Sequence, residues 1–120
     1  DAVGSKTNLA GASKKTYQMD IRNSDDSFRE VALDLKEGAD MILVKPGMMY
    51  LDIISKLKNQ FKTPILAYQV SGEYSLIKDG IKNKLLNEDS ILESIIAFKR
   101  AGACAIISYF AIDIAKKLVR

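Results

Sequence analysis

The sequence contains no histidine and a single cysteine among its 120 residues. These two side chains supply most protein ligands of zinc, so a Cys/His metal cluster is excluded within the chain, as is a histidine-dependent serine triad. One cysteine also excludes an internal disulfide framework, which favours a protein of a reducing compartment. Cys104 lies inside the apolar run 103–109, so we expect it to be a buried small hydrophobic residue.

Long apolar runs, blocks of like charge and glycine-rich phosphate loops are absent as well. No stretch of about 18 apolar residues occurs that could cross a membrane, and the N-terminus lacks the layout of a secretory signal. The 18 Lys and Arg residues are spread along the chain against 15 Asp and Glu, which leaves a net charge of +3. We therefore expect a cytoplasmic protein with neither a membrane nor a nucleic acid as partner.

What is present is a composition of 48% hydrophobic and 28% charged residues, enough for one modest globular core. Residues 1–24 are rich in Gly, Ser, Asn and Lys and read as a loop. Because the chain opens with Asp1 in this loop-like segment, without an initiator methionine, we expect a fragment of a longer protein.

Helical and strand patterns alternate from residue 25 onward. They predict a helix over 25–37, a strand over 40–46, a helix over 50–61, a strand over 65–70, a turn at 71–73, helices over 74–82 and 88–100, a strand over 103–110 and a helix over 112–120. Strands that are apolar almost throughout, each separated by helices, favour a parallel sheet. The predicted fold class is α/β.

An internal repeat relates two of the predicted strands. The helix end, glycine and strand around Gly38 recur around Gly102, and Lys45 and Tyr109 each stand seven residues after these glycines. We therefore expect both side chains at the same height and on the same parity of their strands, pointing into one site. The carboxyl ends of parallel strands are where active sites are built, so Tyr68 and Ser71 belong to the same rim.

Lys45 is the strongest candidate for chemistry. It ends the apolar run 41–44 and is followed by Pro46 and Gly47, where a buried strand should open into a loop. An amine that loses hydration there is a candidate nucleophile towards a carbonyl group, and the hydroxyls on the rim are suited to hold a polar substrate group. The alternative is a lysine that snorkels from a strand end to water.

The string Met-Ile-Leu-Val-Lys-Pro-Gly-Met-Met-Tyr-Leu-Asp at 41–52 resembles the delta-aminolevulinic acid dehydratase family, also called porphobilinogen synthase. Further resemblance lies at 15–20, 67–74, 99–103 and 108–110, so that it spans about residues 1–120. It implies the C-terminal βα units of a TIM (β/α)8 barrel within a single catalytic domain. Residues 1–24 would be mostly an active-site lid loop, and the N-terminal part of the barrel would lie upstream.

The resemblance also implies a lyase of tetrapyrrole (heme) biosynthesis, a homo-octamer that condenses two molecules of 5-aminolevulinate to porphobilinogen with loss of two waters. Lys45 would form the Schiff base with one substrate, whose carboxylate Ser71 and Tyr109 would bind while Tyr68 packs over it. Gln18 would contact the carboxylate of the second substrate. Lys14, near which the family usually has an arginine on the lid, would complete the substrate-binding set.

The metal sites are predicted only from the resemblance to the family. Glu30 aligns with a glutamate that holds an allosteric Mg²⁺ through its hydration shell in some members, and a solvated helix carboxylate is the alternative. A Zn²⁺ or Mg²⁺ site would lie upstream, and we expect these 120 residues alone to be inactive. Two other functions stay open: another Schiff-base lyase of the aldolase type on a TIM barrel, and a non-catalytic binding module.

Overall fold

The computed structural model describes residues 25–118, and its contacts divide the chain into two units, residues 1–38 and 39–120. In the first unit the described element is helix α1 (Asp25–Lys36), which has Asp25 and Asp26 in its first turn and Lys36 in its last. These charges complement the helix dipole. Gly38 follows with a φ of +105°, a left-handed conformation that ends the helix as expected.

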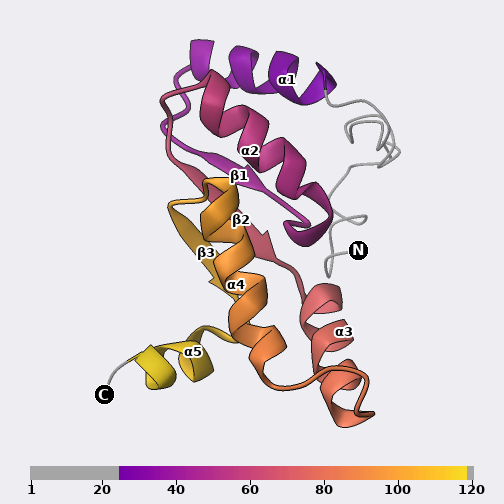
Figure 1. The fold of residues 1–120 in the computed structure, drawn as a ribbon. Helices are drawn as coiled ribbons and strands as arrows, with labels where there is room; N and C mark the ends of the chain where they lie inside the picture. The colour runs from indigo at the N-terminus through magenta and orange to yellow at the C-terminus, as the bar shows by residue number, and fades with distance from the viewer. Residues whose placement is uncertain (1–24, 119–120) are drawn as a thin grey trace, which may run out of the picture. The chain divides into compact units, whose positions relative to one another are not determined.

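The second unit contains a three-stranded parallel sheet in the order β1-β2-β3. Its elements along the chain are β1 (Ile42–Val44), the 3-10 helix η3 (Met48–Tyr50), α2 (Leu51–Gln60), β2 (Ile65–Gln69), α3 (Ser71–Lys82), α4 (Asp89–Ala101), β3 (Ala105–Ser108) and α5 (Ala111–Leu118) (Figure 1). The alternation of parallel strands with helices confirms the α/β fold class, and the strands at 42–44 and 105–108 are shorter than predicted.

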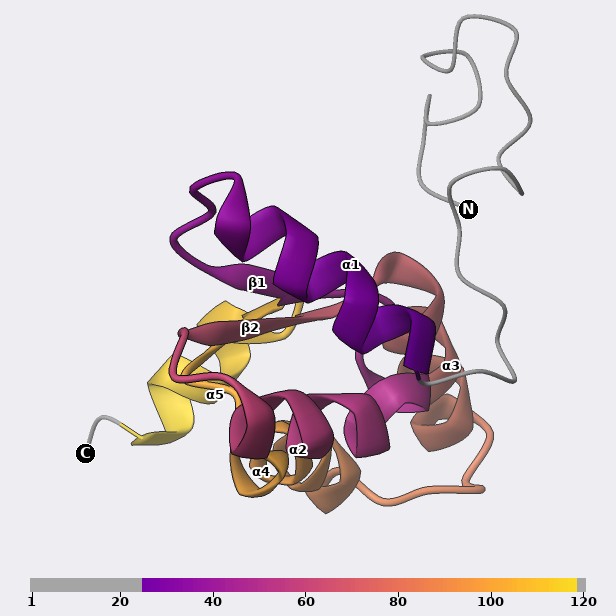
Figure 2. The same ribbon diagram turned by 90° about the horizontal axis from the view of Figure 1, so that it is seen from above.

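Helices α2 and α4 pack against each other and cover one face of the sheet (Figure 2). The core beneath them is apolar and buried, and it includes Ile54, Leu57, Ile65, Ala67 and Phe98. On the other face, Leu43 and Ile107 are 48% and 45% exposed, so the described elements of this unit leave that face open. A cover on one face only is the arrangement of a barrel wall, because a doubly wound open sheet carries helices on both faces.

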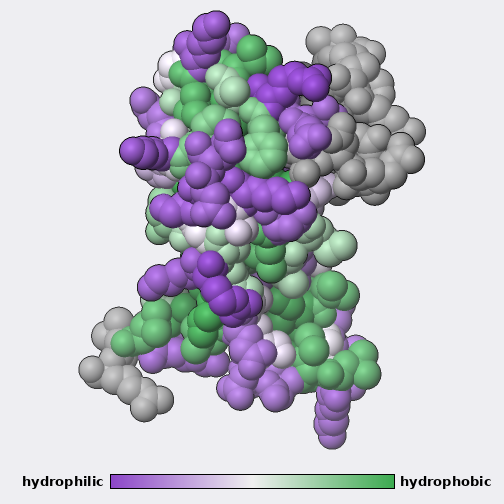
Figure 3. Space-filling view, turned by 45° about the horizontal axis from the view of Figure 1, so that its top comes forward, coloured by the Kyte–Doolittle hydropathy of each residue, from purple (hydrophilic) through white to green (hydrophobic). Residues whose placement is uncertain are grey.

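Apolar side chains also lie on the outer surface of the helices. Figure 3 shows hydrophobic residues gathered in the lower part of the view, where Figure 1 places α3, α4 and α5. The largest exposed ones on these helices are Leu76, Ile96, Ile112 and Leu118. None of the helices in the described residues is long and apolar enough to cross a membrane.

The sheet register refines the predicted alignment of Lys45 with Tyr109. Continuing the pairing of β1 with β2 by one residue past Val44 brings Lys45 level with Tyr68, which pairs with Ile107 in β3. The prediction of equal parity is confirmed, and the prediction of equal height is wrong, because Tyr109 stands two residues beyond the level of Lys45. A barrel of eight strands with a shear of 8 is staggered by about one residue per strand, so two strand intervals give the observed offset.

Two further local predictions are wrong. The expected turn at 71–73 is the first turn of α3, because the Glu73 carboxylate accepts a hydrogen bond from the Val70 N–H and so caps the helix start. Cys104 is exposed and not buried. It stands one residue before β3, an edge strand of the described sheet, and no described element covers it there.

A glycine is required at position 47, in the loop after β1, because there is no room for a side chain there. Its N–H donates to the Tyr68 carbonyl over 2.9 Å, and a Cβ at this position would collide with the buried Phe98 ring and lie 3.1 Å from the Tyr68 oxygen. We predict that Gly47→Ala lowers the free energy of unfolding of the intact protein by about 1–3 kcal/mol, since overpacking of this kind forces side chains and backbone to shift.

Gly72→Ala is the matched control, because nothing lies within 4 Å of a Cβ built on Gly72. Denaturant titrations of both variants test the prediction. A Gly47→Ala midpoint equal to that of Gly72→Ala would contradict the close packing described for this loop.

Candidate active site at the carboxyl ends of the strands

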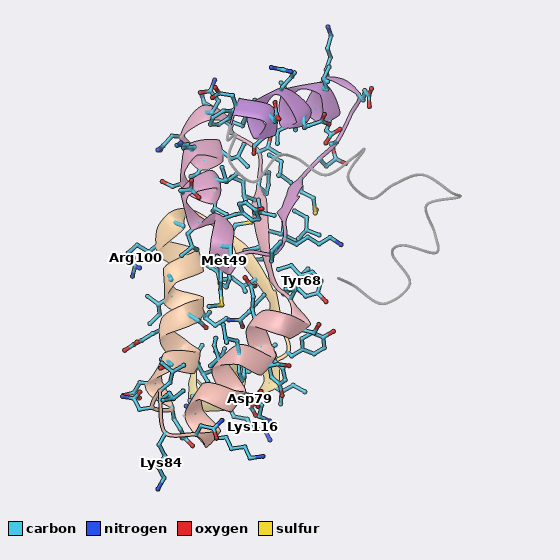
Figure 4. All side chains as sticks on the ribbon, turned by 90° about the vertical axis from the view of Figure 1, so that its right-hand side faces the viewer. Met49, Tyr68, Asp79, Lys84, Arg100 and Lys116 are labelled. Atoms are coloured by element: carbon cyan, nitrogen blue, oxygen red, sulfur yellow. The ribbon has the colours of Figure 1, made fainter. Side chains whose placement is uncertain are left out.

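The predicted site residues of the described segment lie at one edge of the sheet. Lys45 directly follows β1, Tyr68 lies near the end of β2, Ser71 begins α3, and Tyr109 directly follows β3. Because side chains alternate along a strand, Lys45, Tyr68 and Tyr109 belong to the open face. Figure 4 shows Tyr68 on the side of the sheet opposite Arg100 and its helix α4.

The two tyrosines contact each other. A hydrogen bond with the Tyr109 side chain raises the pKa of Tyr68 above its ordinary value, and burial adds to the rise. The ring of Tyr74 lies 5.4 Å from the Tyr109 ring and 4.5 Å from the Phe110 ring, centroid to centroid. Tyr109 is 57% exposed, and it is nevertheless oriented by contacts from β2 and α3.

We predict that Tyr109→Phe lowers the pKa of Tyr68 towards its ordinary value, because the variant keeps the ring and removes the hydroxyl that favours neutral Tyr68. A pH titration of the tyrosine ring carbons by NMR measures this. Tyr74→Phe is the control, since it preserves the ring contact with Tyr109. An unchanged Tyr68 pKa in Tyr109→Phe would show that the two hydroxyls do not interact.

Lys45 and Ser71 are both exposed, so the predicted loss of hydration at the Lys45 amine is not found among the described residues. Within the described part of the chain, the Lys45 ammonium has no carboxylate partner, so its amine is accessible to a ligand. Ser71 is the first residue of a 12-residue helix, and N–H groups in a first helical turn favour a bound anion. The rim therefore offers an accessible amine, phenol and serine hydroxyls, and a helix N-terminus suited to a carboxylate.

A buried polar network supports this rim from the helix-covered face. The Gln69 side chain has no exposed surface, donates to Ser94 Oγ over 2.9 Å and to Met48 Sδ over 3.4 Å, and accepts from Ser108 Oγ. Ser108 Oγ in turn accepts from the Phe110 N–H over 3.0 Å. The network thus connects β2, β3, α4 and η3 at the level of the candidate site.

We predict that Ser108→Ala lowers the free energy of unfolding by about 1–3 kcal/mol, because it leaves the Gln69 carbonyl oxygen and the Phe110 N–H without their partner. Ser75→Ala, an exposed position in α3, is the control and should cost no stability. Urea denaturation of the intact protein compares the two variants. Equal midpoints would mean that water or a neighbouring group replaces the serine hydroxyl.

Comparison with known proteins agrees with this architecture. The family model described as delta-aminolevulinic acid dehydratase matches residues 1–117. The chain belongs to this family. It is 53% identical to the dehydratase of Bradyrhizobium diazoefficiens over 119 residues, covering 98% of this chain and 33% of the relative. It is also 53% identical to the Archaeoglobus fulgidus dehydratase over 105 residues, covering 88% and 33%.

A solved delta-aminolevulinic acid dehydratase, the Toxoplasma gondii ME49 porphobilinogen synthase in complex with its product porphobilinogen, has a TM-score of 0.86 with this chain. The two are 46% identical, and the match covers 92% of this chain and 32% of that structure. The described strands and helices are therefore βα units of the dehydratase TIM barrel, which confirms the predicted fold. The chain spans about a third of the length of the relatives it matches.

Glu30 lies on the exposed surface of α1. No group of three or more His, Cys, Asp or Glu within residues 25–118 is placed to hold a metal ion. Lys14 and Gln18, the other predicted substrate contacts, lie outside the described residues.

Two residues of the dehydratase rim were missed by the sequence analysis. Gln69 is a polar residue on the buried parity of an apolar strand, a position that signals a hydrogen-bonded network. Glu73 is third in its helix and buried, and its carboxylate accepts hydrogen bonds from the N–H groups of Met48 and Val70. Burial raises the pKa of the Glu73 carboxyl, and these N–H groups oppose the rise.

Proposed function

We propose that the protein carrying this chain is a porphobilinogen synthase, a lyase that condenses two molecules of 5-aminolevulinate to porphobilinogen with loss of two waters, as a step of tetrapyrrole and heme biosynthesis. The observation that carries the proposal is the arrangement of Lys45, Tyr68, Ser71 and Tyr109 at one rim of a barrel wall in a chain of this family. The name of the solved neighbour, a porphobilinogen synthase bound to porphobilinogen, supports the same reaction.

Lys45 is the proposed nucleophile. Its neutral amine adds to the ketone carbon of 5-aminolevulinate, and loss of water from the adduct gives an imine. The imine withdraws electrons, so a proton leaves the neighbouring carbon and the resulting enamine forms the new carbon-carbon bond. The Lys45 side chain is exposed and has no carboxylate partner among the described residues, which leaves its amine accessible to the substrate.

The hydroxyl groups of the rim are proposed to bind the carboxylate of this first substrate. Ser71 offers its hydroxyl at the N-terminus of α3, where the helix dipole favours a negative charge. Tyr109 offers a phenol that is oriented by Tyr68 and Tyr74, and Tyr68 packs over the substrate. Gln18 is proposed to contact the carboxylate of the second substrate, and Lys14 to bind substrate from the lid over the site.

Several features stay predictions from the resemblance. We propose that residues 1–120 are the C-terminal part of one TIM-barrel catalytic domain, with 1–24 mostly a lid loop. The resemblance also underlies four further proposals: an octameric assembly, a cytoplasmic location, a Mg²⁺ bound near Glu30, and a Zn²⁺ or Mg²⁺ site elsewhere in the protein. The chain alone is expected to be inactive, because three described strands do not close an eight-stranded barrel.

The test is borohydride reduction of the intact protein in the presence of 5-aminolevulinate, followed by mass mapping of the peptides. We predict an adduct on the peptide that carries Lys45. Lys45→Ala should abolish this adduct and lower turnover by roughly a thousandfold or more, because a covalent step is lost. Lys62→Ala is the control, since Lys62 precedes β2 and so lies towards the opposite end of the sheet.

Near-normal turnover of Lys45→Ala would overturn the proposed nucleophile. An adduct on another lysine alone would reduce Lys45 to a supporting residue. If no adduct formed and no porphobilinogen appeared, the reaction itself would need replacing, and aldol cleavage by the same amine would be the next reaction to assay.

A further inference from the structure

The Glu73 carboxylate joins two segments that are far apart in the sequence. One oxygen accepts a hydrogen bond from the Met48 N–H over 2.8 Å, and the other accepts from the Val70 N–H over 3.2 Å. Met48 begins η3, which leads into α2, and Val70 directly precedes α3. One buried carboxylate therefore caps the starts of two helices that follow neighbouring strands.

These two segments carry two of the proposed catalytic and binding groups. Lys45 stands three residues before Met48, and Ser71 directly follows Val70. The loop after Lys45 is held by the Glu73 carboxylate and by the bond from the Gly47 N–H to the Tyr68 carbonyl. Glu73 touches neither Lys45 nor Ser71 in these bonds, so its influence on them passes through the backbone.

We propose that Glu73 is a positioning residue, which fixes the backbone around Lys45 relative to that around Ser71 and so holds the amine at the correct distance from the substrate carboxylate. The inference rests on the proposed function, in which Lys45 attacks the substrate that Ser71 binds. Misplacement of reacting groups by about 1 Å can cost about a hundredfold in rate. Glu73 thus contributes to imine formation without contacting the substrate.

The chemistry of the side chain explains why a glutamate is required. Both carboxylate oxygens accept hydrogen bonds, whereas a glutamine has one oxygen and an NH₂ group that would face a backbone N–H. Glu73→Gln keeps the size and loses one of the two bonds. Glu73→Asp keeps both acceptor oxygens on a side chain shorter by one methylene, so it should restore part of the function that Glu73→Gln loses.

The experiment measures the rate of imine formation on Lys45 in the intact protein, by borohydride quenching at short times with saturating 5-aminolevulinate. We expect Glu73→Gln to slow this step by roughly 10–100-fold, with a smaller change in KM, and Glu73→Asp to recover part of the loss. Leu57→Ala, a cavity variant in the buried face of α2, controls for lost stability and should form the imine at the wild-type rate.

Hydrogen exchange of the Met48 and Val70 amides is the second readout, and it needs no substrate. We expect the amide that loses its acceptor in Glu73→Gln to exchange faster than in the wild-type protein, and neither amide to do so in Leu57→Ala. The inference is overturned if Glu73→Gln forms the imine at the wild-type rate, or if it slows no more than Leu57→Ala. If the wild-type protein forms no imine, the proposed function fails together with the catalytic part of this inference, and amide exchange decides the capping role separately.

Discussion

The buried side chain of Gln69 is the constraint on which the carboxyl end of the sheet depends. An amide with no exposed surface costs stability unless its oxygen and nitrogen find partners, and these partners come from three other segments: Ser108, Ser94 and Met48. Apolar contacts in the rest of the core tolerate small shifts, whereas hydrogen bonds fix both distance and direction. The hydrogen bonds of Gln69 therefore fix the strand ends at this rim more narrowly than apolar contacts would.

Much of the fold could be predicted because each strand and helix has a recognisable pattern of apolar residues in its own segment of the sequence. The strands at 42–44, 65–69 and 105–108 are apolar on both faces except at their carboxyl ends, as is typical of a parallel sheet, and the helices between them show a one-sided apolar stripe. Gly38 and Gly102 both adopt positive φ, which is why the helix, glycine and strand pattern repeats. The parity argument for Lys45 and Tyr109 followed from the same repeat.

The interactions that the sequence could not predict are those between distant segments. The bond from the Met48 N–H to the Glu73 carboxylate joins residues 25 positions apart, and the hydrophobic periodicity of either segment does not indicate such a bond. The two-residue offset between Lys45 and Tyr109 arises from the stagger between strands, which is a property of the sheet and not of either strand. The burial of Cys104 was predicted from its apolar neighbours in the sequence alone. Whether a residue at a strand end is buried depends on which other elements cover that end.

The open face of the sheet carries two kinds of residue: apolar side chains that would fill the barrel interior, and the polar side chains of the proposed site at the strand ends. Leu43, Leu66 and Ile107 share the parity of Tyr68 and stand at or below its level along the strands. In a closed barrel such residues fill the interior, so water reaches the rim only from the loop side. The amine of Lys45 and the hydroxyl of Tyr109 then stand above an apolar floor, where hydrogen bonds and charges act more strongly than in water. The apolar residues below the proposed site are thus part of its environment, and the hydrogen bonds of Gln69 and Glu73 fix the strand ends that carry the polar groups.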